Sequence, residues 1–254
     1  MNSSKMIFSL LVLLGCGTVQ AQDARQIIQE VQKREASKSQ RYEGTLEVIG
    51  NENHVTTKRW VYQRIGDFGN SKAILRFTAP ADVKGVGLLI VNHTDRASDQ
   101  WMWRPSIGRD QRIALQDRST RFFGTDFSFE DMEERDAGQF EFRILGEQEI
   151  DGTPCWHIQS VPKQSKTSQY TSSQIWIGKD HYVPVRLDNL VKDQVVRRLL
   201  QRNVENVQGI WTPLLLEMTD LRRNSRTVLR MENLRYNVPL RPEAFTVQAL
   251  RLQP

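Results

Sequence analysis

The sequence is poor in the residues that build disulfides, metal sites and common catalytic centres. Its 254 residues include two cysteines and four histidines. The histidines are scattered, and the sequence has no His-Glu-x-x-His, no paired cysteines and no Gly-x-Ser-x-Gly, which are patterns of zinc enzymes, redox sites and serine hydrolases. We therefore predict that the protein is not an enzyme and needs no metal or cofactor.

Long apolar runs are missing as well. The apolar stretch at residues 6–14 follows Lys5 and is too short to span a bilayer. Val-Gln-Ala at residues 19–21 ends in a small residue of the kind that a signal peptidase cuts after. We predict a signal peptide at residues 1–21 and export of the protein to the periplasm.

The same N-terminal segment permits an alternative. Leu-Leu-Gly-Cys at residues 13–16 is similar to a lipobox, which would leave Cys16 lipidated and the protein anchored to a membrane. If cleavage follows Ala21 instead, Cys155 is the remaining cysteine and no internal disulfide can form. We interpret Cys155 as a small buried side chain, because free cysteine is usually buried.

A large excess of either charge is also lacking, since 35 Lys and Arg oppose 30 Asp and Glu for a formal net charge of +5. This balance is not typical of nucleic-acid binding, and export removes the protein from DNA and RNA. No Pro-, Gly- or Ser-rich linker divides residues 22–254. We therefore expect one large β domain with a sizeable core, and a monomer.

The hydrophobic pattern that is present begins with one helix and then alternates with a period of two. Ile27, Ile28 and Val31 form an apolar helical stripe, and Asp23 is positioned to cap it. About a dozen strands follow in meander order, which favours a sandwich or a barrel. The continuous apolar run at residues 86–91 indicates a strand that is covered on both faces.

The most unusual stretch is residues 100–135. Trp101 and Trp103 share one face of a strand, and a turn and a second strand follow. Ser128, with Asp131 three residues later, is typical of a helix N-cap. Aromatic residues without strand alternation surround this cap, namely Phe122, Phe123, Phe127 and Phe129. We predict a hairpin that leads into an aromatic loop and a short central helix over the sheet.

The chain also carries a series of short motifs. They are Gln-Ile-Ile at 26–28, Pro-Ala-Asp-Val-Lys-Gly at 80–85, Asp-Gln-Trp at 99–101, Phe-Gly-Thr-Asp-Phe-Ser-Phe-Glu-Asp at 123–131, Asp-Gly-Thr-Pro-Cys-Trp at 151–156, Ile-Trp-Ile at 175–177 and Gly-Ile-Trp-Thr-Pro at 209–213. The motifs occur in the order of the family and are distributed over nearly the whole mature chain. The series resembles the family of outer membrane lipoprotein-sorting proteins, which are bacterial periplasmic relatives of the LolA and LolB lipoprotein carriers.

The resemblance implies a mainly β protein with a few helices, an α+β fold. Its core is a strongly curved, incompletely closed antiparallel β-barrel, whose apolar concave face is covered by the N-terminal helix and the short central helix. It also implies a periplasmic carrier of lipid or lipoprotein acyl chains, in outer membrane lipoprotein sorting or in lipid export alongside a membrane exporter of the resistance-nodulation-division type. The alternative is a periplasmic adaptor or sensor of such an exporter that binds protein and not lipid. Fold alone does not decide between them.

A carrier of acyl chains needs large apolar side chains around its concavity. The candidate wall consists of Leu46, Val48, Trp60, Leu89, Val91, Trp101 and Trp103. The candidate lid consists of Phe122, Phe123, Phe127, Phe129 and Met132. The alternative is that these side chains form a dry core, where such residues usually lie.

Two groups of charged residues accompany the same stretch. The first group consists of five arginines, Arg104, Arg109, Arg112, Arg118 and Arg121. They can attract an anionic head group or an acidic partner. The alternative is that they are solvated charges of loops and strand edges. We interpret the acidic group as the solvent face of the short helix and not as a metal site; it consists of Glu130, Asp131, Glu133 and Glu134.

Overall fold

The computed structural model describes residues 23–50 and 54–252. The predicted signal peptide, the lipobox alternative and the centre of the turn predicted at residues 50–53 lie outside this part of the chain. Within it, no helix combines the length and the apolar character that a membrane crossing requires.

The described residues form one antiparallel sheet of 13 strands that does not close, which confirms the predicted curved, open barrel. Across the sheet the order is β6-β5-β4-β3-β2-β1-β13-β12-β11-β10-β9-β8-β7. The strands are β1 (Ser39–Ile49), β2 (Val55–Asp67), β3 (Asn70–Ala79), β4 (Gly87–Val91), β5 (Asp99–Arg104), β6 (Arg109–Arg112), β7 (Phe140–Ile150), β8 (Thr153–Pro162), β9 (Ser172–Gly178), β10 (Pro184–Val191), β11 (Gln194–Val207), β12 (Ile210–Asp220) and β13 (Ser225–Tyr236).

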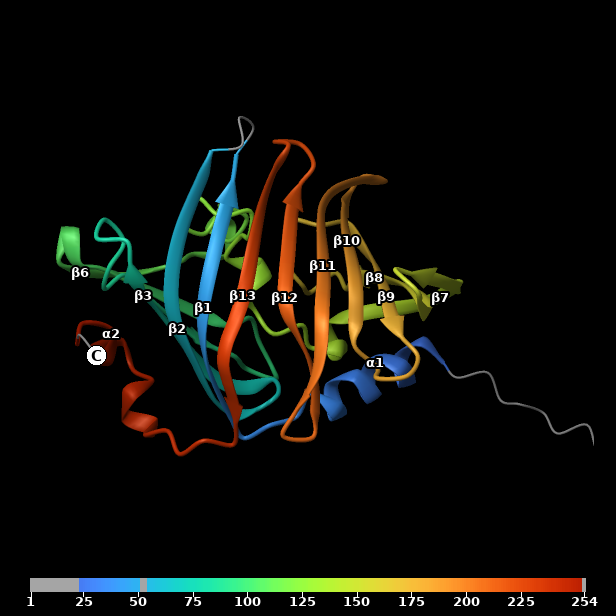
Figure 1. The fold of residues 1–254 in the computed structure, drawn as a ribbon, viewed down its shortest axis with the longest axis horizontal. Coiled ribbons are helices and arrows are strands. Elements are labelled where there is room, and N and C mark those ends of the chain that lie inside the picture. The colour runs from blue at the N-terminus through green and yellow to red at the C-terminus, as the bar shows by residue number, and fades with distance from the viewer. Residues whose placement is uncertain (1–22, 51–53, 253–254) are drawn as a thin grey trace, which may run out of the picture.

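The two edges of the sheet, β6 and β7, are consecutive strands in the chain. The first and last strands pair with each other in the middle of the sheet, so the segment between β6 and β7, residues 113–139, connects the edges behind the central strands (Figure 1). We call this segment the plug. The face of the sheet that it contacts is the inner face, and the opposite face is the outer face.

The N-terminal helix α1 (Ala24–Arg34) begins as predicted at Asp23. The Asp23 carboxylate accepts a hydrogen bond from the Arg25 N–H, and the Gln26 side chain accepts one from the Asp23 N–H at 3.3 Å. These two bonds satisfy donors that a helix start leaves free. The buried stripe of α1 packs against aliphatic residues of β8 and β9, among them Ile158 and Ile175. The helix therefore covers the inner face near one edge of the sheet.

Strand β4 is covered on both faces, as its apolar run predicted. Leu88 and Ile90 belong to the cluster that contains the plug aromatics, whereas Leu89 packs against Phe245 and Leu250. The outer cover is the C-terminal segment with its short helix α2 (Val247–Leu250), drawn in red beside β3 and β6 (Figure 1). The strand thus separates two hydrophobic clusters.

The short central helix is present only as one 3-10 turn, η3 (Glu130–Met132). Ser128 and Asp131 do bond to each other: the Ser128 hydroxyl and N–H donate to the Asp131 carboxylate at 2.7 and 2.8 Å, and the Asp131 N–H donates to the Ser128 hydroxyl at 3.3 Å. The residue at the N-cap position of the turn is Phe129, however, so the predicted cap at Ser128 is one residue too early. The backbone is extended again at Glu133, with φ −81° and ψ 151°.

The hairpin between β7 and β8 is the one that Asp151-Gly152 predicted. Both residues have positive φ, 49° and 80°, which this pair tolerates at the centre of a two-residue turn. Just beyond it, Cys155 is 1% exposed, which confirms that it is a small buried side chain. Burial raises the pKa of the Cys155 thiol to about 11.

Candidate functional site

A cavity of about 230 Å³ lies between the plug and the inner face of the sheet from β9 to β12. Its apolar lining includes Phe127, Phe140, Ile175, Leu187, Leu199, Leu216 and Met218. Its polar lining includes Glu130, Asp131, Glu133, Glu134, Arg135, Lys166, Ser168, Tyr170 and Ser173. The three leucines remain partly exposed although they point inward, because they face this space.

The strand register arranges the inner face around the cavity in two neighbouring rows. The polar row runs directly across six paired strands and consists of Ser160, Ser173, Asn189, Arg197, Asp220 and Ser225. An apolar row lies next to the polar row, two residues away from it on each strand. It consists of Ile158, Ile175, Leu187, Leu199 and Met218 and ends at Thr227. Residues two apart on a strand share a face, so a polar edge and an apolar floor lie side by side.

Asp126 connects the plug to β13 by hydrogen bonds, at the end of these rows. Its side chain is fully buried and accepts hydrogen bonds from Ser225 Oγ at 2.6 Å, Thr227 Oγ1 at 2.8 Å and Arg121 Nη2 at 2.9 Å. The Asp126 N–H donates to the same Thr227 hydroxyl at 2.9 Å. A buried carboxylate is stable only with such partners, so the plug and β13 fit each other at this point.

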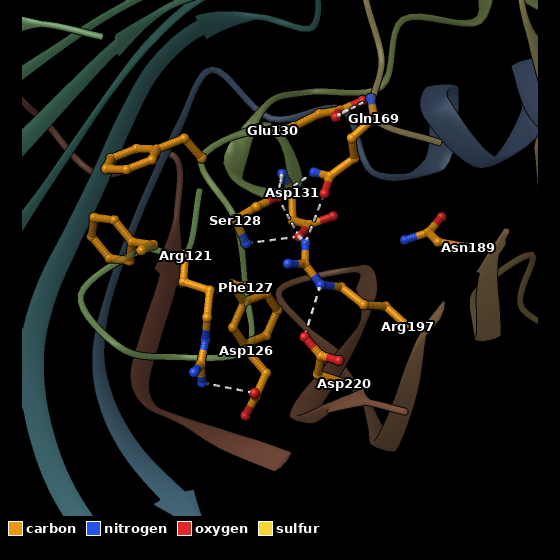
Figure 2. A network of polar contacts seen from close by, with 12 residues as sticks. Arg121, Asp126, Phe127, Ser128, Glu130, Asp131, Gln169, Asn189, Arg197 and Asp220 are labelled. Atoms are coloured by element: carbon orange, nitrogen blue, oxygen red, sulfur yellow. Dashed lines mark hydrogen bonds and ion pairs between the residues drawn. The ribbon is translucent and has the colours of Figure 1, made fainter. Parts of the chain in front are cut away.

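Asp131 makes the second contact between the plug and the polar row. Figure 2 shows Arg197 reaching from β11 between Asp131 of the plug and Asp220 of β12; its guanidinium lies 3.0 Å from the Asp131 carboxylate and 3.8 Å from that of Asp220. The buried Tyr170 hydroxyl donates to Asp131 at 2.9 Å. Burial raises the pKa of Tyr170 far above its ordinary value, and the neighbouring Asp131 charge adds to this effect.

The remaining acidic residues also hold the plug in place, so their interpretation as a solvent face was wrong. Glu130 accepts from Ser168 Oγ and the Gln169 N–H, at 2.5 and 2.9 Å. Glu133 pairs with Arg118 and Lys166, and Glu134 accepts from Ser71 Oγ at 2.7 Å and the Gly69 N–H at 2.8 Å. These carboxylates contact both halves of the sheet or its loops.

The arginines around residue 110 do not form one positive mouth. Arg118 is buried and pairs with Glu133, and Arg121 pairs with Asp126. Arg112 pairs with Asp99 on the outer part of the sheet, and the Arg104 guanidinium lies over the Phe123 ring, 5.8 Å from its centroid. Arg109 is exposed. Arg109 is a solvated charge on the edge strand β6, whereas Arg118 and Arg121 have structural partners.

The structure separates the predicted wall residues into two groups on opposite faces. Leu46 and Trp60 belong to the inner cluster with the plug, and Val48 lies two residues beyond Leu46, paired with Thr227. By contrast, four residues pack on the outer face against the C-terminal segment, namely Leu89, Val91, Trp101 and Trp103. These four cannot line a cavity together with Leu46, since the sheet lies between them.

Most of the predicted lid residues are packed in the inner cluster and do not line the cavity. Phe122, Phe129 and their neighbours Phe123 and Met132 join Trp60 in the inner cluster, and the Phe122 and Phe129 ring centroids are 5.4 Å apart in an edge-to-face contact. Here the alternative of a dry core describes the structure. Only Phe127 of the predicted lid residues lines the cavity.

Sequence reasoning missed the cavity wall on the other half of the sheet. Its members, Leu187, Leu199, Leu216 and Met218, lie on strands that the alternation did predict. On β12 large apolar residues at every second position, Leu214, Leu216 and Met218, were a visible signal for an apolar face, whereas on β10 and β11 polar residues share that face. Arg135 was missed because nothing in the local sequence distinguishes it from its charged neighbours.

Within the described ranges, no group of three or more His, Cys, Asp or Glu side chains is placed to hold a metal ion. The acidic residues of the plug are close in sequence but are each occupied by hydrogen-bond donors. The site therefore consists of an apolar floor, a polar row and a plug that ion pairs attach to both.

Comparison with known proteins places the fold. A protein family described as "uncharacterized protein" matches residues 69–252. The crystal structure of a DUF1329 family protein from Desulfovibrio piger superimposes with a TM-score of 0.86 at 26% identity, over 89% of this chain and 97% of that chain. An outer membrane lipoprotein-sorting protein domain from Vibrio parahaemolyticus superimposes with a TM-score of 0.85 at 24% identity, over 90% of this chain and 98% of that chain. For a LolA superfamily protein from Nitrosomonas europaea the TM-score is 0.69 at 19% identity, over 89% of this chain and 98% of that chain.

No protein of curated function matches the chain in sequence. The chain belongs to the family that matches residues 69–252, and it has the fold of the outer membrane lipoprotein-sorting and LolA-like proteins. The resemblance seen in the sequence motifs is thereby confirmed.

Proposed function

We propose that the protein is a periplasmic carrier that shelters acyl chains of a lipid or lipoprotein between the plug and the inner face of β9 to β12. The cavity carries this proposal, because its floor of Leu187, Leu199, Leu216 and Met218 is apolar and its three leucines remain partly uncovered by protein. Each CH₂ group buried there contributes about 0.8 kcal/mol. A likeness to lipoprotein-sorting folds agrees with this function but does not establish it.

The size of the cavity limits what it accepts without rearrangement. At about 230 Å³ it is larger than the roughly 150 Å³ apolar cavity that holds benzene, yet smaller than the roughly 300–1,000 Å³ of pockets for drug-sized ligands. It accommodates part of one acyl chain. Full occupation by a lipid therefore requires the plug to move away from the apolar row.

The direct test is extraction of the protein purified from its native cell envelope, followed by mass spectrometry of the extract. We expect acyl lipid or an acylated peptide at close to one equivalent per protein. Protein that carries no acyl species, and that takes up none from detergent-free vesicles of its own lipids, would contradict the proposal.

A matched pair of variants places the ligand in the cavity. Leu199→Trp puts a bulky side chain into the cavity, whereas Leu200→Trp puts the same side chain on the outer face of β11. We expect Leu199→Trp to lower the affinity for a fluorescent fatty acyl probe by roughly tenfold or more, since several buried CH₂ contacts are lost, and Leu200→Trp to leave it unchanged. Equal effects would argue against this cavity.

The adaptor or sensor function remains the second candidate, because one edge of the sheet exposes apolar residues. Edge strand β7 and its neighbour β8 expose Ile144, Leu145 and Val161 at 38%, 39% and 37%. An uncovered edge can pair with a strand of another protein, such as a component of a membrane exporter. Absence of extractable lipid combined with capture of an exporter subunit through β7 would favour this function.

A further inference from the structure

The polar row is satisfied at one end and unsatisfied at the other. Toward β13, Arg197 and Ser225 have the partners described above. Toward β8, the Asn189 Nδ2 and Ser160 Oγ atoms have no hydrogen-bond partner among the described residues, although both side chains are only 1% exposed. Buried polar atoms in folded proteins are nearly always bonded. The unpartnered Asn189 donor indicates a ligand with acceptor atoms, whereas Ser160 lies two strands away from Asn189, on the other side of Ser173.

The positively charged Arg135 lies beside Ser173, in the β8 half of the polar row. The Arg135 Nη2 atom donates to Ser173 Oγ at 3.3 Å, and Ser173 Oγ in turn donates to Asn189 Oδ1 at 2.7 Å. The guanidinium lies over the Phe140 ring, 4.9 Å from its centroid. A guanidinium offers five N–H donors in a fork that matches a carboxylate or phosphate, and this contact with Ser173 uses one of them.

The acidic residues near Arg135 are engaged elsewhere. No carboxylate of the described chain forms an ion pair with Arg135 within 4.0 Å; Asp131 pairs with Arg197, and Glu130 accepts from Ser168 and Gln169. Burial lowers the pKa of the Arg135 guanidinium, against the charges of Asp131 and Glu130. A half-buried cation that forms no ion pair of its own is less favourable than a paired one, and an anionic ligand supplies the partner.

The apolar floor begins directly beside this group. Ser173 is two residues from Ile175 on β9, and Asn189 is two residues from Leu187 on β10, so each polar side chain has an aliphatic neighbour on the inner face. Arg135 and these aliphatic residues line the same cavity. A molecule with an oxyanion at one end and a hydrocarbon chain at the other fits both parts at once.

We propose that Arg135 and Asn189, which both contact Ser173, form a head-group site for an anionic lipid, whose carboxylate or phosphate oxygens bind these donors while its chain lies along Ile175, Leu187 and Leu199. This inference rests on the proposed function as an acyl-chain carrier and names its ligand class. Acylated lipoproteins, whose chains end in esters and amides, lack the oxyanion at that position.

The test compares a pyrene-labelled long-chain fatty acid with its methyl ester, which has the same chain and no charge. Binding to the delipidated full chain is measured by fluorescence for the wild-type protein, Arg135→Met and Arg135→Lys, with Arg143→Met on the exposed part of β7 as the control. We expect Arg135→Met to weaken fatty acid binding by roughly tenfold or more, the worth of a charge-assisted hydrogen bond, and to leave binding of the ester unchanged. The affinity of Arg135→Lys for the fatty acid should lie between those of the wild-type protein and Arg135→Met, because lysine keeps the positive charge but loses the forked N–H donors of the guanidinium.

A second readout separates recognition from a structural role. Arg135 forms no ion pair in the empty protein, and Arg135→Met loses one hydrogen bond to Ser173 and the contact of the guanidinium with the Phe140 ring, so the melting temperature should fall only slightly. If Arg135→Met weakens both probes equally, or weakens neither, the head-group site is wrong while the carrier function stands. If the wild-type protein binds neither probe, both proposals fail. If inorganic phosphate alone displaces the fatty acid at comparable concentration, the site holds a free anion and the lipid assignment is overturned.

Discussion

At the scale of single residues, the inner face mixes polar groups that hold the fold with polar groups that have no partner in it. Ser173 and Ser160 illustrate the difference, since they are directly paired across β8 and β9 and are equally buried, at 2% and 1% exposed. Ser173 Oγ accepts from Arg135 and donates to Asn189. Ser160 Oγ has no partner in the described chain.

This contrast predicts opposite effects of the same substitution. Ser173→Ala removes a hydroxyl that satisfies two neighbours, so it should lower the free energy of unfolding by about 1–3 kcal/mol. Ser160→Ala removes an unsatisfied buried hydroxyl, so it should leave the stability unchanged or raise it by up to about 1 kcal/mol. Urea denaturation of the delipidated variants measures both values. A loss at Ser160 as large as the loss at Ser173 would mean that Ser160 has a partner that the structure does not show.

At the scale of elements, the plug is attached to the sheet by carboxylates, and Asp126 is the most deeply buried of them. Asp126→Ala leaves Ser225 and Thr227 without their acceptor and Arg121 without its counter-ion, at a cost of about 3 kcal/mol. We expect Asp126→Ala to accelerate amide hydrogen exchange, relative to the wild-type protein, more in residues 113–139 than in the central strands. Asp136→Ala is the control, because it removes only the cap of the 3-10 turn at Ala137–Gln139. Equal acceleration in plug and sheet would show that the two unfold together.

Elements that depend on local pattern were predictable from the sequence. The capping residues of α1, the double burial of β4 and the positive-φ turn at Asp151-Gly152 all follow from neighbours within a few residues. The faces of β4 and β5 were not predictable in this way. Trp101 and Trp103 share a face as expected, but whether that face meets the plug or the C-terminal segment depends on Phe245 and Leu250, which are distant in sequence.

The candidate site was less predictable than the fold for the same physical reason. Alternation showed that Leu187 and Leu199 are on one face of each strand, but the cavity exists only because the plug fails to fill the space above them. The partners of Arg135 come from β9 and from Phe140. A side chain that acts through contacts between distant segments has no local signature.

At the scale of the whole molecule, the chain order makes the plug a bridge between the two edges of an open sheet. It follows β6 and precedes β7, so both of its ends are fixed to strands. We expect that such a segment can move away from the inner face while both of its ends stay attached, and that its ion pairs and hydrogen bonds to the polar row oppose this movement.

If ligand enters only when the plug has swung open, then binding should be limited by that opening at high ligand concentration. We expect the observed rate of fatty acid uptake, followed by stopped-flow fluorescence, to level off as the probe concentration rises, because a unimolecular opening precedes binding. Asp126→Ala weakens the closed state by about 3 kcal/mol, which raises the open population by roughly a hundredfold. The plateau rate should therefore rise strongly in this variant while the Arg135 preference for the acid over the ester persists. A rate that stays linear in probe concentration, and is the same in Asp126→Ala, would show that the cavity fills through a permanent opening and that the plug is a fixed part of the core.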